Sequence, residues 1–402
     1  SFFAIMPEIL LSPAAGAMVD RWDRRWLMIG GNFGAGIATF ALVLLAVAGH
    51  LSPWSAYAII GISSAFQAVQ YPALSASTPL LVPAQHLSRA NGAVEFGNAM
   101  AMVAAPFTAA LFLSAIGLKG IFTINLVTFA CAVAALLLSR IPAPVHGSGQ
   151  RSGMGWLHQA IEGWTYIRVH REFLGLLLLF AAINFAFGTV QVLLPPLVLS
   201  FATPMALGTV MSCAGAGLLT GSLVISILGA PRRKVSAILF LAFGQGLVLF
   251  LGVSRLSVPL VSGAAWLFSI CTISIFVISQ TIWQTQIPQE IQGRAFAIRR
   301  LISWSTLPLA YLSAGPLADK VFEPLLAPKG ILAASVGSLI GIGQGRGIAL
   351  LFVLMGGLMI ATVSVASFYR PFWELQSRMT RPGRKPLDLC REPGRNQERI
   401  VI

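Results

Sequence analysis

Long apolar stretches follow one another along almost the whole chain, and they constrain its fold more than any other feature. Residues 27–48, 122–138, 173–199 and 347–367 are four examples. A helix needs about 20 apolar residues to cross the hydrocarbon of a bilayer. The chain is 56% hydrophobic and 10% charged, whereas a soluble domain carries about 25% charged residues. Because a water-soluble fold cannot hide this much apolar surface, the sequence predicts a membrane protein.

The apolar runs favour helices over strands. A membrane β-barrel is built from segments of about 10 residues in which polarity alternates strictly. The runs here are longer, unbroken and rich in Leu, Ala and Gly, so we predict an all-α membrane protein. Prolines inside the runs predict kinks, which membrane helices tolerate. Eleven spans are predicted, at residues 1–19, 27–48, 54–80, 91–114, 119–139, 173–199, 206–229, 235–254, 258–284, 296–318 and 346–368.

Basic residues between the spans predict the orientation in the membrane. One alternate set of loops carries fifteen Lys and Arg residues, Arg299 and Arg300 among them, and the opposite set carries five. Positively charged loops stay on the cytoplasmic side, so the C-terminus is expected to be cytoplasmic in a cell (inner) membrane. Topology thus explains the formal net charge of +14. Nucleic-acid binding is not indicated, because no basic stripe is interleaved with stacking aromatics.

The two halves of the chain share short features at a constant offset of 205 residues. Gly16-Ala-Met-Val corresponds to Gly221-Ser-Leu-Val, Val82-Pro83 to Ile287-Pro288, and Arg89-Ala90 to Arg294-Ala295. Parallel repeats about an axis along the membrane normal are a known transporter architecture. In this register the partner of the span at 173–199 precedes residue 1, so we expect that a first helix is missing from this chain.

The repeat predicts four parts. We expect an N-terminal helix bundle over residues 1–140, a cytoplasmic linker over 141–172, a C-terminal helix bundle over 173–370 and a cytoplasmic tail over 371–402.

A charged motif follows the first predicted span and reads Gly16-Ala17-Met18-Val19-Asp20-Arg21-Trp22-Asp23-Arg24-Arg25. Gly16 lets two helices approach closely, and Asp20 can face the positive N-terminus of a neighbouring helix. We expect Arg21, Arg24 and Arg25 to pair with this acid, and Glu95 to be a further partner of the arginines. Together these residues form a predicted conformational latch. The plainer interpretation is that the charges only end the helix at the membrane face.

This motif closely resembles the signature between the second and third helices of the major facilitator superfamily, with departures at Met18 and Asp23. Residues 101–110 have the layout of the superfamily's antiporter motif, with Ala in place of each Gly. The segment from Tyr71 to Asn91 is similar to the exporter branch that includes macrolide efflux pumps, the enterobactin exporter and lysophospholipid transporters. The resemblance implies the major facilitator fold, two six-helix bundles with alternating access, and it names no substrate.

Polar residues at helical spacing inside three spans predict a substrate cavity. Polar side chains that face lipid are costly, so such stripes favour a cavity at the interface of the repeats. The cavity residues selected from these stripes are Gln67, Gln70, Asn184, Gln191, Thr272 and Trp283. Alternatively, the amides only cross-link helices by hydrogen bonds. Amides, hydroxyls and aromatics with little charge suit an amphipathic substrate better than a small anion, which would need paired arginines.

Glu8 is the one acid well inside a predicted span. An intramembrane carboxylate is a candidate functional group, so we expect Glu8 to couple export to a proton gradient. Two other interpretations stay open: Glu8 is a partner for a residue on the missing helix, or it lies near the outer surface.

Three functions fit these features. The first is a monomeric secondary active exporter, a proton-coupled antiporter of small amphipathic molecules such as a drug, siderophore or other metabolite. The second is a lysophospholipid flippase, and the third is a non-transporting membrane receptor or an inactive relic. An enzyme is not expected, because the chain has no nucleophile motif and no phosphate-binding Gly loop. The four cysteines lack metal-ligand spacing, so neither a metal nor a cofactor is expected.

Overall fold

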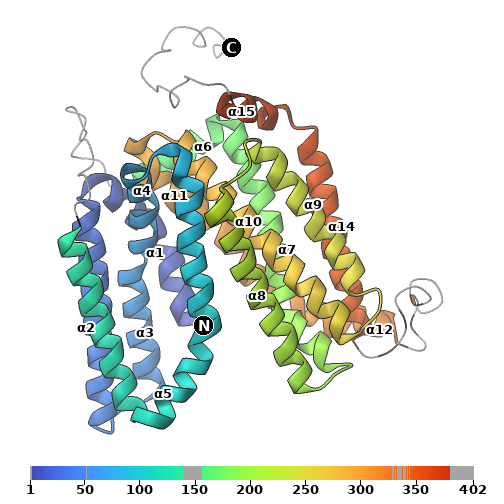
Figure 1. Ribbon diagram of the computed structural model, residues 1–402, viewed down its shortest axis with the longest axis horizontal. Coiled ribbons are helices and arrows are strands. Elements are labelled where there is room, and N and C mark those ends of the chain that lie inside the picture. The colour runs from blue at the N-terminus through green and yellow to red at the C-terminus, as the bar shows by residue number, and fades with distance from the viewer. Residues whose placement is uncertain are drawn as a thin grey trace.

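The computed structural model describes residues 2–50, 52–139, 156–327 and 345–380, with five single positions between 330 and 343. These residues form helices that stand side by side in two bundles (Figure 1). The N-terminal bundle contains α1 (Phe2–Arg21), α2 (Arg24–Val47), α3 (Pro53–Gln67), α4 (Gln70–Leu81) and α5 (Leu87–Leu138). The C-terminal bundle contains α7 (Arg171–Leu199), α8 (Pro204–Leu228), α9 (Lys234–Gly252), α10 (Val258–Gln286), α11 (Gln292–Leu317), α12 (Glu323–Leu325) and α14 (Arg346–Ser367).

Short elements cover the ends of the bundles. Helix α6 (Trp156–Val169) falls within the predicted linker and α15 (Arg370–Thr380) begins at the predicted tail, so these two segments contain helices that hydropathy did not indicate. Both lie at the same end of the molecule (Figure 1). The turns at the bundle ends are η1 (Ala84–His86), η2 (Gln289–Ile291) and η3 (Ala318–Phe322).

The predicted spans coincide with helices of the structure, with two differences in continuity. The span expected at 54–80 is divided into α3 and α4; Pro72, in the first turn of α4, has no backbone N–H to continue the α3 hydrogen bonds. The spans expected at 91–114 and 119–139 are joined as α5, in which Gly117 has a φ of 66°. Glycine adopts this left-handed conformation at no steric cost, so the chain reverses there without a longer loop.

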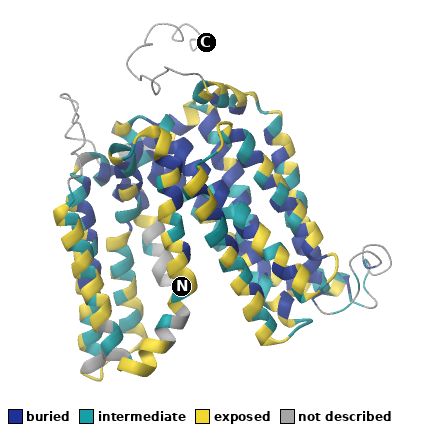
Figure 2. Ribbon diagram, in the orientation of Figure 1, coloured by how far each residue is buried: buried dark blue, intermediate teal, exposed yellow. Residues whose placement is uncertain are grey.

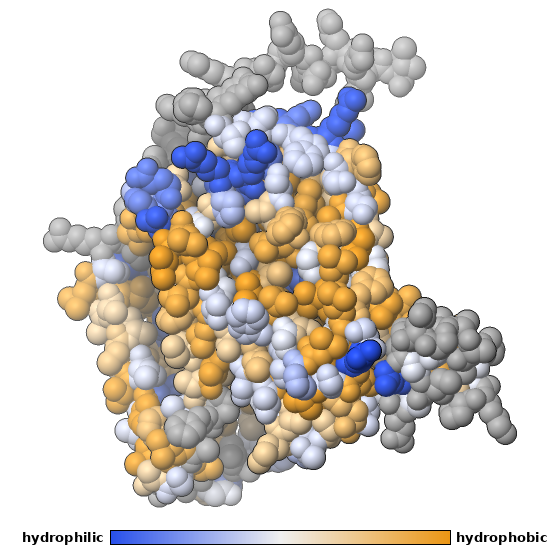
Figure 3. Space-filling model, turned by 45° about the vertical axis from the view of Figure 1, so that its right-hand side comes forward, coloured by the Kyte–Doolittle hydropathy of each residue, from blue (hydrophilic) through white to orange (hydrophobic). Residues whose placement is uncertain are grey.

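The outer faces of the bundles are apolar, as a bilayer requires. Six described helices are long and apolar enough to cross a membrane: α2, α7, α8, α9, α10 and α14. Large apolar side chains are left exposed on them, such as Phe240, which is 76% exposed. Exposed residues lie along the outward sides of the helices (Figure 2). On the face drawn in Figure 3, apolar side chains cover most of the side, and hydrophilic ones gather mainly at the end that carries α6 and α15. The chain is therefore a multi-pass membrane protein.

The two bundles differ in the size of their buried apolar core. In the C-terminal bundle one continuous cluster of buried side chains joins α7, α9, α10, α11 and α14, with Phe173, Ile238 and Ile282 among its fully buried members. The described part of the N-terminal bundle has a smaller cluster around Val19, Leu27 and Met28. The C-terminal bundle is thus the more tightly packed of the two.

The two bundles meet at one end of the molecule, the end that carries α4, α6 and α15, and diverge toward the other (Figure 1). We call this contact region the junction. On one side of it, α1 crosses α11 so closely that a Cβ on Gly16 would lie 2.4 Å from the Cβ of Ala297. On the other side, α5 crosses α8, and a Cβ on Gly92 would lie 2.7 Å from the backbone nitrogen of Ser226. Ala297 and Gly92 are 205 residues apart, so the repeat found in the sequence relates the two crossings.

Replacement of Gly16 by Ala is expected to destabilise the protein. The new methyl group would overlap Ala297, and overpacking of this kind costs about 1–3 kcal/mol. The measurement is thermal unfolding of the purified protein. Gly30→Ala is the matched control, because no atom lies within 4 Å of a Cβ at Gly30 and removal of a helix-interior glycine stabilises by about 0.5–1 kcal/mol. Equal unfolding temperatures for the two variants would contradict close packing at the junction.

Candidate functional site

Asp20 joins the two bundles at the junction. Its carboxylate lies at the last turn of α1 and is fully buried. It accepts hydrogen bonds from the backbone N–H groups of Gly293 (2.7 Å) and Arg294 (3.0 Å), the second and third residues of α11. The Arg294 guanidinium donates to it as well, at 3.1 Å. A helix N-terminus has unpaired N–H groups and a positive partial charge, so it stabilises an anion at this place.

Glycines allow α1 and α11 to approach each other closely enough for these hydrogen bonds. A Cβ on Gly293 would lie 2.4 Å from Oδ1 of Asp20 and 2.5 Å from the carbonyl oxygen of Gly16. Ser12, two turns before Asp20, donates from its hydroxyl to the Ala297 carbonyl at 3.0 Å. Helix α1 therefore presents the Ser12 hydroxyl, and the glycine and carboxylate of the motif, on the face that is directed at α11.

The arginines of the motif bind backbone carbonyl groups. Arg24 is buried and donates to the Ala76 carbonyl within α4 (2.8 Å) and to the Gln289 carbonyl before α11 (3.4 Å). Arg25 donates to the carbonyl groups of Leu136 and Leu137 at the end of α5. The contacts of Arg25 satisfy a helix C-terminus, where cations are favoured. The side chain of Arg21 lies outside the described residues.

The expected pairings of the latch differ in part from the contacts of the structure. The described ion pair of Asp20 is with Arg294 of the opposite bundle. Arg24 interacts electrostatically with Asp20, but its hydrogen bonds, like those of Arg25, go to carbonyl groups. Glu95 forms no described ion pair with Arg24 or Arg25; it hydrogen-bonds Asn98 and lines a cavity. The spacing of the motif indicated the residues but not their partners, because those partners come from helices far away in sequence.

Helix α10 closes the junction with a row of amides. Gln284 accepts from Asn91 at 2.7 Å and donates to the Ser75 carbonyl at 3.0 Å, so it binds both α4 and α5. One turn away, Gln280 accepts from the Tyr71 hydroxyl at 3.3 Å. These two glutamines were not selected from the sequence, although their spacing of four residues places them on one face of a helix. The residue selected on this part of the span was their neighbour Trp283, which faces the core.

Three cavities lie between and beside the bundles and share lining residues. The first, of about 480 Å³, lies mainly in the N-terminal bundle and contains the predicted residues Gln67 and Gln70. The second, of about 60 Å³, contains the predicted residues Asn184 and Thr272. Tyr71, Phe276 and Arg300 line both, so the two cavities adjoin. We call the second one the central pocket.

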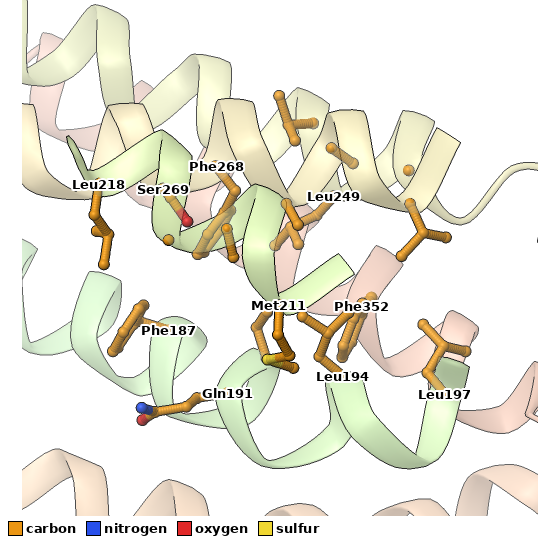
Figure 4. Close-up of a pocket in the computed structure, with 18 of the residues that line it drawn as sticks. Phe187, Gln191, Leu194, Leu197, Met211, Leu218, Leu249, Phe268, Ser269 and Phe352 are labelled. Carbon is orange, nitrogen blue, oxygen red and sulfur yellow. The ribbon is translucent and has the colours of Figure 1, made fainter. Parts of the chain in front are cut away.

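The third cavity is an apolar chamber of about 520 Å³ among α7, α8, α9 and α10, with α5 on one side. Figure 4 shows Leu194, Met211 and Phe268 around it, with the predicted residue Gln191 at its edge. Gln191 accepts a hydrogen bond from the Tyr311 hydroxyl at 2.6 Å. Phe187 lines both this chamber and the central pocket, so these two cavities adjoin as well.

Trp283 belongs to the core, and its selection as a cavity residue was wrong. Its side chain is fully buried and packs on Phe173, with ring centroids 5.3 Å apart. No described cavity is lined by it. Of the two residues predicted on α10, Thr272 lines the central pocket and Trp283 does not, whereas its neighbours Gln280 and Gln284 line the cavity of the N-terminal bundle.

The expectation of a cavity with little charge was wrong as well. Arg299 and Arg300, counted among the loop residues, lie on α11 and line the central pocket. They are only 7% and 6% exposed. The guanidinium of Arg300 lies over the rings of Tyr71 and Trp304, at 4.6 and 4.7 Å from their centroids. When hydropathy is averaged over a long apolar helix, single charged residues near one end of that helix have little effect on the average and are missed.

Two further predictions fall on parts of the chain that the structure does not describe. The side chain of Glu8 lies outside the described residues, as do those of Pro106, Ala109 and Ala110 in the antiporter-like motif. Among the residues that are described, no group of three His, Cys, Asp or Glu side chains could hold a metal ion.

Comparison with known proteins agrees with this geometry. Residues 1–308 match the family described as Major Facilitator Superfamily. Macrolide efflux protein A of Streptococcus pyogenes is 25% identical over 330 residues, which are 80% of each chain. The protein of that name from Enterococcus faecalis is 25% identical over 77% of this chain and 97% of its own. Multidrug efflux pump Tap of Mycobacterium bovis is 24% identical over 78% of this chain and 77% of its own.

Solved structures share the fold. A bacterial homologue of the iron transporter ferroportin, in an outward-facing state, superposes with a TM-score of 0.62 at 16% identity, covering 94% of this chain and 89% of its own. FucP in the outward conformation superposes with a TM-score of 0.62 at 14% identity, covering 92% and 88%.

Two repeat-related helix bundles around cavities within the bilayer define a membrane transporter. The chain belongs to the Major Facilitator Superfamily. As a member of this family it is a transporter of small molecules and not an enzyme, and its sequence relatives include efflux pumps.

Replacement of Asp20 by Asn is expected to open the junction. The amide keeps one acceptor oxygen, but it loses the charge and the second acceptor, and hydrogen bonds to a charged group contribute about 1.5–3 kcal/mol. The measurement is the rate at which a maleimide labels a cysteine introduced at Ser75, in a background without the native cysteines. The rate should rise about tenfold or more, and transport should fall while the amount of protein in the membrane stays constant.

The matched control is Asp319→Asn, which removes an exposed acid from the end of α11. Labelling of this control should equal that of the unsubstituted protein. If Asp20→Asn leaves both labelling and transport unchanged, Asp20 only terminates α1 and the latch is refuted.

Proposed function

We propose that this transporter is a proton-coupled exporter of small amphipathic molecules that works by alternating access. In this proposal it is a monomer in the cell (inner) membrane, with its C-terminus in the cytoplasm. The observation that carries the proposal is the closed junction at one end of a series of cavities. The loops expected to be cytoplasmic lie at that end. In this orientation the conformation described here faces outward.

Alternating access requires contacts that form in one state and break in another. The junction supports such a role, because directional hydrogen bonds join the bundles there, among them those of Asp20, Gln280 and Gln284. The continuous core of the C-terminal bundle joins its helices to one another, so that bundle can move as one body. Separation of the bundles would open the cavities toward the cytoplasm.

Export is the favoured direction because several sequence relatives are named as efflux proteins. The apolar chamber supports an amphipathic substrate, since its lining is dominated by Leu, Val, Met and Phe side chains. Burial of apolar surface contributes about 25 cal/mol for each Å² removed from water, so a chamber of this size can hold a substrate without charged contacts.

The proposal is tested with intact cells that express the protein and are loaded with amphipathic fluorescent dyes and macrolides. Accumulation should be lower than in cells without the protein, and a protonophore should abolish the difference. Export that continues after the proton gradient collapses would refute proton coupling. Equal accumulation in both kinds of cell for every compound would refute export.

Glu8 is the proposed coupling residue. In proteoliposomes, Glu8→Gln should lose the acceleration of transport by an imposed pH gradient but keep substrate exchange without a gradient, because only the proton-binding group is removed. Glu374→Gln, an exposed acid on α15, is the control and should respond to the gradient normally. A Glu8→Gln variant that still responds to the gradient would exclude this residue from coupling.

A further inference from the structure

Arg299 is a buried cation without a described counter-ion. Its guanidinium donates to the Gln280 side-chain oxygen at 2.6 Å and to the Ser279 hydroxyl at 3.2 Å. The described residues place no carboxylate within ion-pair distance of it. Three aromatic rings surround the guanidinium, those of Phe180, Phe276 and Trp283, at 5.8, 6.0 and 5.3 Å from their centroids. The burial of a charge is costly unless an opposite charge approaches it.

The central pocket beside Arg299 offers neutral hydrogen-bond donors. The hydroxyl of Ser303 is buried and lines this pocket, and no described residue is within hydrogen-bond distance of it. The amide of Asn184 lines the pocket from the facing helix α7. No acidic side chain is among the described residues that form its wall. A cavity needs roughly 10–15 Å³ for each water-sized group, so about 60 Å³ suits a head group of a few atoms.

The apolar chamber adjoins this pocket at Phe187, whose side chain lines both. The ring of Phe187 is stacked on that of Phe268, with centroids 6.4 Å apart and planes at 4°. A cationic pocket of about 60 Å³ therefore opens beside an apolar chamber of about 520 Å³. A ligand that fills both has a compact polar head and a bulky apolar body.

We propose that the cavity selects amphipathic organic anions, with a carboxylate or phosphate head at Arg299 and the apolar body in the chamber. Such a head would accept charge-assisted hydrogen bonds from the guanidinium and further bonds from Ser303 and Asn184. The inference specifies the substrate class of the proposed exporter. Transport of such anions depends on the proposed function, whereas their binding does not. A purely structural role for Arg299, as a link between α10 and α11 through Gln280, would provide no opposite charge for the buried guanidinium.

The test is binding to the purified protein in nanodiscs of a neutral phospholipid. The probes are 1-naphthaleneacetate, its uncharged amide and 1-naphthylmethylamine, which share one apolar body and differ in the charge of the head. Binding is followed by tryptophan fluorescence, since Trp304 lines the pocket. The anion should bind about tenfold or more tightly than the amide, the difference expected for hydrogen bonds to a charged group. The amine should bind most weakly.

Variants test whether Arg299 causes the preference for the anionic probe. Arg299→Gln should abolish the preference for the anion but keep the affinity for the amide. Arg299→Lys should retain a reduced preference, because the charge remains and the planar pair of donors is lost. Arg232→Gln, which removes an exposed arginine distant from the cavity, is the control for net charge and should bind like the unsubstituted protein.

The comparison of the three probes on the unsubstituted protein is enough to refute the proposal, so the test does not depend on whether a variant folds. Equal affinity for the anion and the amide, or tighter binding of the amine, would refute an anion site. An unchanged preference in folded Arg299→Gln would refute the assigned residue. Displacement of 1-naphthaleneacetate by lysophosphatidate or by decanoate would support the proposal, and the more effective competitor identifies a lipid or a free acid as the source. Loss of export in cells with intact anion binding would contradict the proposed function and leave this inference standing.

Discussion

The hydrogen bonds between the Asp20 carboxylate and the first N–H groups of α11 govern the arrangement of the two bundles. They form across the molecule rather than within one bundle, and they pair an anion with the positive end of a helix. Because the carboxylate is fully buried, it needs every one of these donors to offset the loss of water. A small separation of the bundles removes all of them together. Such an interaction behaves as a two-state contact, and the rest of the junction follows it.

The junction and the cavities use different chemistry, and this division suits a transporter. Contacts at the junction are directional and polar, from Asp20 to the glutamines of α10. The chamber in the C-terminal bundle is lined mainly by apolar side chains, which impose little direction on a ligand. Between them lies the central pocket, where Arg299 is bound by Gln280, and Gln280 in turn accepts from Tyr71 of the opposite bundle. One glutamine thus connects the pocket to the contact that closes it.

Much of this architecture could be predicted from the sequence, and the limits have physical causes. The spans were predictable because bilayer thickness fixes the length of an apolar run, and the offset of 205 residues indicated the two related crossings at Gly16 and Gly92. The partners of Arg24 and Glu95 were not predictable, since they depend on how distant helices pack. Arg299 was counted with the loop residues because the boundary between a span and a basic loop is predicted from an average over many residues. Such an average cannot place a single arginine near the end of a helix. On α10, Thr272 does line a cavity, but Trp283 was selected in place of its neighbour Gln284, and one position rotates a helix by about 100°.

The two crossings at the junction are related by the repeat but differ in chemistry, and this difference bears on how the molecule opens. Where α1 meets α11 there is a buried ionic contact, whereas at the corresponding place Ile225 stands in the position of Asp20 and the link is a Ser88 hydroxyl that accepts from the Ala230 backbone. Under the proposed alternating access, the uncharged seam between α5 and α8 is expected to separate before the ionic one, so that the contact between α1 and α11 would act as the hinge of the motion.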